Sequence, residues 1–136
     1  MIRRLVALGV VVTVFAACTR TNAALMDNSV HLARTCPDAV KLYMSPDKVG
    51  GAYTEVALLN STGSTGFTTE GGMMKSMRKK AADVGANGII MGGIDEPGAG
   101  AKVAGAFLGT GTERKGKSVA IFVPGDTGRV RRVCRN

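Results

Sequence analysis

The chain is poor in the residues that build catalytic and metal sites. Its 136 residues include no tryptophan, two tyrosines, four phenylalanines, three cysteines and a single histidine. That histidine, His31, has no cysteine cluster or spaced carboxylate pair beside it in the sequence, which argues against a metal or general-base role. The adjacent acids Asp95 and Glu96 would point apart rather than work as an acid–base pair. We therefore expect a protein that is not an enzyme and has no cofactor or metal site.

No serine has a base in the right setting for a nucleophilic triad, and this applies to Ser61, Ser64 and Ser118. Residues 111–118 do fit the phosphate-loop pattern G-x-x-x-x-G-K-[ST]. That loop requires a strand before it and a helix after it. Here a Gly-rich stretch precedes the pattern and an apolar strand, Val119 to Val123, follows it. We expect a basic turn and no nucleotide binding.

Only one long apolar run is present, and it stands at the N-terminus. Leu5 to Ala17 is 13 residues without a charge, after Arg3 and Arg4. A transmembrane helix needs roughly 20 apolar residues, whereas a signal peptide needs fewer. Residues 1–17 are therefore interpreted as an export signal.

The signal ends in Phe15-Ala16-Ala17-Cys18, which resembles the lipobox of bacterial lipoproteins, with Phe15 in place of the usual leucine. The resemblance implies cleavage before Cys18 and acylation of its sulfur and amine. By resemblance to enterobacterial sorting, Thr19 after the cysteine implies delivery to the periplasmic face of the outer membrane. The alternative is an ordinary secretory signal, cleaved after Ala17 or further on, that releases the protein from the membrane.

Acidic residues are scarce: 10 stand against 18 lysines and arginines, for a net charge of +8. Four arginines crowd the predicted basic tail at 125–136 and form a candidate basic patch: Arg129, Arg131, Arg132 and Arg135. Basic clusters attract phosphate groups. In an exported protein, anionic lipid head groups are available partners and nucleic acid is not. The alternative is a solvated surface.

After a polar tether at 18–35, residues 36–136 are predicted to form a single domain. Alternating apolar residues predict strands near 40–44 and 53–59, with a Ser/Thr/Gly loop at 60–66. Thr68-Thr69-Glu70 is typical of a helix start, and Gly85 of a helix end. Apolar strands at 89–91 and 119–123 follow, separated by a Gly/Ala-rich loop at about 92–117. The expected fold is α+β, in the order β-β-α-β-β, with one helix packed on a small mixed or antiparallel sheet.

Residues 77–91, MRKKAADVGANGIIM, resemble a helix-to-strand signature of small bacterial envelope proteins. These include the outer-membrane lipoprotein that senses damage for the Rcs phosphorelay, and the same signature occurs in the small YbjQ-like domains. Both families place two strands before the helix and two after it. The resemblance implies this fold, a non-enzymatic role and, in one version, envelope-stress sensing.

Met73, Met74 and Met77 stand at helical spacing, and their thioethers suit Cu(I). Methionine is also a common core residue, and Met73 and Met77 share a stripe with Ala81. Core packing is the favoured interpretation, and the alternative is a Cu(I)-binding module. The two differ in whether these side chains point into the core.

With Cys18 used for lipid, Cys36 and Cys134 remain as an even pair in an oxidising compartment. Both flank the predicted sheet, so we expect a disulfide between them; the alternative is two free thiols. It would hold the basic tail against the start of the domain, beside the tether and the membrane. The function expected from the sequence is a lipid-anchored binding or interaction module, whose partner is another envelope protein or anionic lipid.

Overall fold

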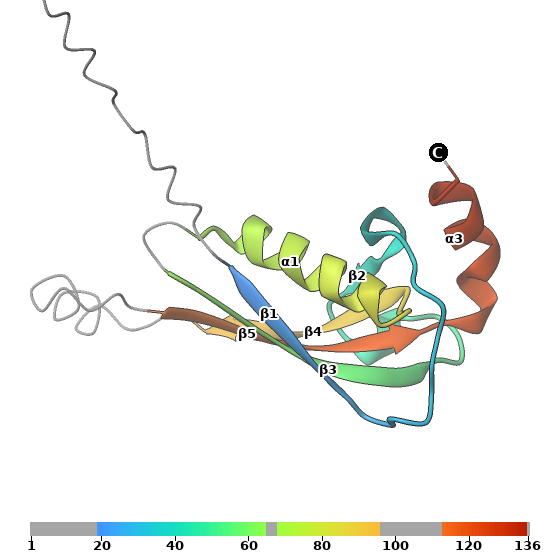
Figure 1. Cartoon of the computed structure of the whole chain (residues 1–136), viewed down its shortest axis with the longest axis horizontal. Helices are drawn as coiled ribbons and strands as arrows, with labels where there is room; N and C mark the ends of the chain where they lie inside the picture. Colours follow the sequence, from blue (N-terminus) through green and yellow to red (C-terminus); the bar gives the residue numbers. More distant parts are fainter. Residues whose placement is uncertain (1–18, 65–67, 96–112, 136) are drawn as a thin grey trace, which may run out of the picture.

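One twisted sheet of five strands carries the fold, with a long helix across one face and a short helix at its C-terminal end (Figure 1). The structure is a computed structural model that describes residues 19–64, 68–95 and 113–135. The strands are β1 (Arg20–Leu25), β2 (Lys41–Tyr43), β3 (Thr54–Ser64), β4 (Gly88–Asp95) and β5 (Glu113–Phe122), and the helices are α1 (Glu70–Asp83) and α3 (Thr127–Val133). The predicted α+β class is confirmed. No described helix is long and apolar enough to cross a membrane.

The spatial order of the sheet is β1-β3-β5-β4-β2. Antiparallel pairs join β1 to β3, β3 to β5 and β5 to β4, whereas β2 runs parallel to β4. The sheet is therefore mixed, and β1 and β2 form its two edges.

The predicted tether at 18–35 contains an edge strand, which corrects its description as a tether throughout. β1 pairs with β3 from Arg20↔Thr62 to Leu25↔Ala57. Thr21 connects this strand to its surroundings, because its Oγ1 lies 3.0 Å from Ser61 Oγ and 2.7 Å from Ser76 Oγ on α1. These polar contacts replace the apolar stripe by which a strand is normally identified from sequence.

The strands are also longer than the sequence pattern predicts. β3 continues to Ser64 through the predicted Ser/Thr/Gly loop, paired with β5 down to Ser64↔Glu113. β4 continues to Asp95 and β5 begins at Glu113, so both ends of the predicted loop at 92–117 are strand. Residues 96–112 lie outside the described part of the chain. Small and hydroxyl residues fit the crowded sheet face under α1, which is why strand continues where the sequence resembles a loop.

Helix α1 begins and ends where the sequence predicts. Thr69 is the N-cap, and its side chain accepts a hydrogen bond of 3.1 Å from the Gly72 amide. Gly85 follows the helix with φ +81°, and a Cβ there would lie 2.4 Å from Leu32 Cβ. Only glycine satisfies both the left-handed conformation and this close approach. The helix buries Met73, Met77, Ala81 and Ala82 against the sheet.

The core lies mainly between α1 and the sheet, around Leu59 and Ile89, which are fully buried. A smaller cluster on the opposite face contains Ile90, Ile121, Val49 and Val123. Because Ile89 and Ile90 point to opposite faces, β4 is buried on both sides, as its continuous apolar sequence predicts. It lies inside the sheet, between β5 and β2.

The predicted C-terminal tail at 125–136 is described as far as Arg135 and is largely helical. A short 3-10 turn, Pro124–Asp126, leads into α3. The predicted disulfide between Cys36 and Cys134 is present, with 5.5 Å between the two Cα atoms. It fixes the end of α3 beside the turn that precedes β2.

Candidate binding surfaces

Three of the four predicted arginines form an exposed cationic surface on and just after α3. Arg131, Arg132 and Arg135 line a shallow depression of about 540 Å³ together with Gly128. All three are exposed, and their side chains make no hydrogen bond or ion pair with any described residue. We call these three residues the arginine patch.

Arg129 belongs to the structure of the tail and not to the patch, which corrects the predicted set of four. Its Nε donates to Asp126 Oδ2 over 2.8 Å, and its Nη2 donates to the Ala39 carbonyl over 2.8 Å. The hydrogen bond from Arg129 is the main cause that holds the pKa of Asp126 below its usual value. The same bond raises the pKa of Arg129. Lys41 Nζ, 3.5 Å from Asp126 Oδ2, adds a weaker ion pair.

The arginine patch lies at the opposite end of the domain from the point where the chain enters. Arg20 pairs with Thr62, near the start of α1, whereas Thr54 at the other end of β3 pairs with Phe122, just before the turn to α3. β3 has 11 residues, which at about 3.3 Å per residue places the two ends roughly 35 Å apart. Figure 1 shows α3 and the start of β1 on opposite sides of the molecule. The disulfide does fix the basic tail beside Cys36, but the patch is not beside residue 19.

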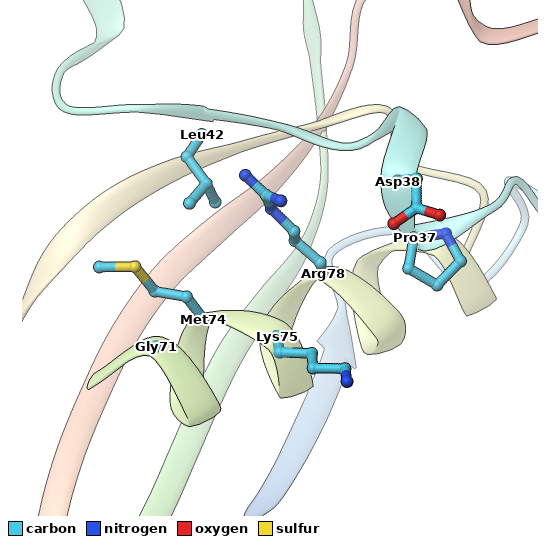
Figure 2. A pocket seen from close by; sticks show the side chains of 7 residues that line it. All are labelled: Pro37, Asp38, Leu42, Gly71, Met74, Lys75 and Arg78. Atoms are coloured by element: carbon cyan, nitrogen blue, oxygen red, sulfur yellow. The ribbon is translucent and has the colours of Figure 1, made fainter. Parts of the chain in front are cut away.

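A groove of about 400 Å³ runs between α1 and the edge strand β2. Figure 2 shows the residues that line it: Pro37, Asp38, Leu42, Gly71, Met74, Lys75 and Arg78. The guanidinium of Arg78 projects from α1 into the space between Leu42 and Asp38 (Figure 2). Its Nε is buried and has no hydrogen-bond partner. The groove thus combines apolar walls with one cation whose hydrogen bonding is incomplete.

The predicted methionines divide between core and groove. Met73 and Met77 are fully buried, and Ser118 Oγ lies 3.5 Å from Met77 Sδ. Met74 lines the groove instead. The two thioethers on the helix stripe therefore point into the core. Among the described residues, no three His, Cys, Asp or Glu side chains gather as a metal-binding group.

The remaining sequence candidates divide between the surface and the core. His31 is exposed on the segment between β1 and β2, and Ser61 and Ser118 are buried under α1. Of the phosphate-loop pattern at 111–118, residues from Glu113 onward lie in β5, and residues 111 and 112 lie outside the described residues. The predicted lipidation site, Cys18, also lies outside them, as does the signal peptide at 1–17.

Asn87 is a buried residue whose role the sequence does not reveal. Its Oδ1 accepts from the Val123 amide over 2.7 Å, and its Nδ2 donates to the Val123 carbonyl over 2.9 Å. The side chain thereby joins the start of β4 to the end of β5. The two glycines beside Asn87 allow close packing of the backbone. A Cβ on Gly85 would lie 2.4 Å from Leu32 Cβ, and a Cβ on Gly88 would lie 2.9 Å from Tyr43. The Gly85–Gly88 end of the signature at 77–91 thus serves packing, whereas Arg78, near its start, lines the groove.

The groove was missed because Arg78 and Lys75 fall on the charged side of the helix pattern, which normally indicates a solvated face. Their setting depends on β2, which packs across from them only in the folded sheet. Nothing in the local sequence marks the unpartnered Nε of Arg78.

No protein-family model matches the chain, and no curated protein matches it. A solved structure does: the crystal structure of a Francisella virulence factor, FvfA, in the orthorhombic form. It is 16% identical, the alignment covers 75% of this chain and 96% of that chain, and the TM-score is 0.53. At this identity the similarity shows a shared fold and nothing about activity.

Proposed function

We propose that the chain is a lipid-anchored, non-enzymatic interaction module of the bacterial envelope. Its anchor is Cys18, and its arginine patch binds an anionic partner away from the anchoring membrane. The single observation that carries the proposal is the position of three unpartnered arginines at the end of the domain opposite to residue 19.

The charge of the patch favours an anionic partner. Arg131, Arg132 and Arg135 have no carboxylate among the described residues to neutralise them, and arginine binds carboxylate and phosphate in a bidentate manner. The disulfide holds Cys134, between these residues, against Cys36. A patch fixed in this way loses less entropy on binding than a flexible tail does.

The anchor rests on the sequence from Phe15 to Cys18 and on the charge-free run before it. Two or more acyl chains give stable membrane binding, whereas one gives only marginal binding. With a lipid at residue 18 and the domain beginning at β1, the arginine patch projects toward the periplasm. Another envelope protein with an acidic surface is the partner that this geometry favours, and envelope-stress sensing is one role for such a contact.

The anchor is tested by fractionating cells that express the chain or its Cys18→Ser variant. We expect the wild type in the membrane fraction, with an acylated N-terminus by mass spectrometry, and the variant in the soluble periplasmic fraction. Identical fractionation of the two, without acyl mass on the wild type, would contradict the anchor.

The patch is tested in cells by placing a photo-crosslinking residue at position 128, inside the depression. We expect a discrete crosslinked product whose yield falls at least about tenfold in Arg131→Glu/Arg132→Glu. A matched control, Lys48→Glu/Lys79→Glu, changes the net charge equally and should retain the product. Equal yields in the two double variants would contradict a partner contact through the patch.

A further inference from the structure

We propose that the groove between α1 and β2 receives an extended segment of a partner protein, which adds to the sheet at the free edge of β2 and places a carboxylate against Arg78. This site is separate from the arginine patch and does not depend on the lipid anchor. Its occupant is a polypeptide strand that contains an acidic residue.

The backbone of β2 offers hydrogen bonds on its outer side. Lys41 donates its amide to the Asn87 carbonyl over 3.1 Å, on the side of β4. Successive residues of a strand direct their N–H and C=O groups to opposite sides, so those of Leu42 point away from β4. No other described strand pairs with β2 on that side. An unpaired edge of this kind is the template for strand addition in peptide recognition.

The space beside the edge fits side chains of an added strand. The groove holds about 400 Å³, with Leu42 and Met74 on opposite walls (Figure 2). Met44, directly after β2, is 77% exposed, which adds apolar surface along the same edge. Side chains that alternate toward the α1 side of an added strand would enter this space.

Charge specifies which side chain belongs there. The buried Nε of Arg78 has no partner in the described structure, and a buried donor without an acceptor is costly. Lys75 lines the same groove. A carboxylate that enters the groove would meet the Arg78 guanidinium in a charge-assisted hydrogen bond, which Lys75 would reinforce. Asp38 lies on the other side of the guanidinium (Figure 2). Its negative charge would repel a second acidic side chain of the partner at that end of the groove.

The test uses a phage-displayed library of random 12-residue peptides, selected against the oxidised chain from Thr19 to Asn136. This portion contains every described strand, α1, α3 and the disulfide. We expect enrichment of peptides with β-branched residues on alternate positions and one acidic residue among them. Absence of enrichment, or a set without acidic residues, would overturn the proposal.

Variants locate the binding of a selected peptide. Arg78→Glu should weaken it at least about tenfold. Lys79→Glu, an equal charge change on an exposed neighbour in α1, should leave affinity within about twofold. Leu42→Pro removes the outward amide but not the ladder to β4, and should also weaken binding. Peptides that bind Arg78→Glu as well as wild type would overturn the site.

A measurement on the wild-type chain guards against misfolding of the proline variant. Peptide addition should slow hydrogen exchange of the Leu42 amide and shift the NMR signal of the Arg78 Nε–H. Two other occupants have distinct outcomes that overturn the proposal. Self-association abolished by Arg78→Glu would indicate a second copy of this chain, and an equal Arg78 shift with acetate alone would indicate a free carboxylate.

Discussion

Met77 is the residue on which the packing of α1 against the sheet most directly depends. It is fully buried and lies in the cluster that contains Leu59 and Ile89. Met77→Ala should lower the free energy of unfolding by about 2–5 kcal/mol, because it removes apolar contacts and leaves a cavity. Met77→Leu nearly conserves volume and should cost less than about 1.5 kcal/mol. Urea unfolding checks both values.

Met74→Leu, in the groove, is the matched control for these two variants and should change stability little. The alternative interpretation, in which the methionines bind Cu(I), predicts a different result. A Met77→Leu variant that keeps its stability but loses Cu(I) binding would show that the thioether acts as a ligand.

The carboxylate of Asp126 makes stability depend on acidity. Its pKa is lowered in the folded state, mainly by the hydrogen bond from Arg129. A lowered folded-state pKa gives stability that is complete above the carboxylate's ordinary value of 3.8 and is lost as pH falls through the folded value. The Asp126 side chain is 17% exposed, so Asp126→Asn should cost toward the lower end of about 1.5–3 kcal/mol at pH 7.

The difference between wild type and Asp126→Asn should shrink when urea unfolding is repeated at pH 3 and below. Asp83→Asn removes a carboxylate that makes no side-chain hydrogen bond or ion pair with the described residues, and it serves as the control. A gap between wild type and Asp126→Asn that stays constant from pH 7 to pH 2 would show that the Arg129 pair contributes nothing through charge.

At the scale of elements, the junction between β4 and β5 depends on one side chain. Asn87→Ala would leave the amide of Val123 without a partner in a buried position, whereas the Val123 carbonyl keeps the hydrogen bond of 3.1 Å from the Asp126 amide. An unsatisfied buried group costs about 1–3 kcal/mol, so we expect a loss of that size in the free energy of unfolding. Thermal or urea unfolding measures it against Asn60→Ala, an exposed asparagine of β3. A loss below about 0.5 kcal/mol would mean that water replaces the side chain at this junction.

Elements whose signals are local were predictable from the sequence. α1 has its cap at Thr69, its apolar stripe at Met73 and Met77, and its end at Gly85, all within one stretch of chain. β4 is identified by its continuous apolar residues. The disulfide was predictable because two cysteines, Cys36 and Cys134, remain once Cys18 is assigned to the lipid, and both flank the predicted sheet.

Elements stabilised by distant contacts were not predictable. β1 has hardly any apolar stripe, and its place depends on Thr21 reaching Ser61 and Ser76, which are 40 and 55 residues away in the chain. α3 is arginine-rich, contains Gly128, and is held by the Cys134 disulfide and by the bond from Arg129 to Ala39. The groove likewise arises only when β2 packs beside α1. The residues next to Arg78 in the sequence therefore do not indicate that it lines a groove.

For the whole molecule, the disulfide is the largest single constraint on the unfolded chain. Cys36 and Cys134 are 98 residues apart in sequence, and in the chain-entropy model a loop near that size contributes about 4.7 kcal/mol as an upper figure. Reduction, or a Cys36→Ala/Cys134→Ala variant, should lower the free energy of unfolding by about 2–5 kcal/mol. Urea unfolding with and without reductant measures the loss. Two alkyl additions to the non-reduced chain would show free thiols instead.

The same cross-link determines the path of a pulling force. If the membrane holds residue 18 and a partner holds the arginine patch, tension enters at Thr19 and leaves near Cys134. The bond at Cys36 then transmits the load directly to Cys134, so the chain from Pro37 to Val130 bears no tension. Only residues 19–36 are in series with the load, and they extend by no more than about 60 Å. Because the load acts along the axis of β1, it shears all the β1–β3 hydrogen bonds together, and the first event under tension is the release of one edge strand from an otherwise intact domain.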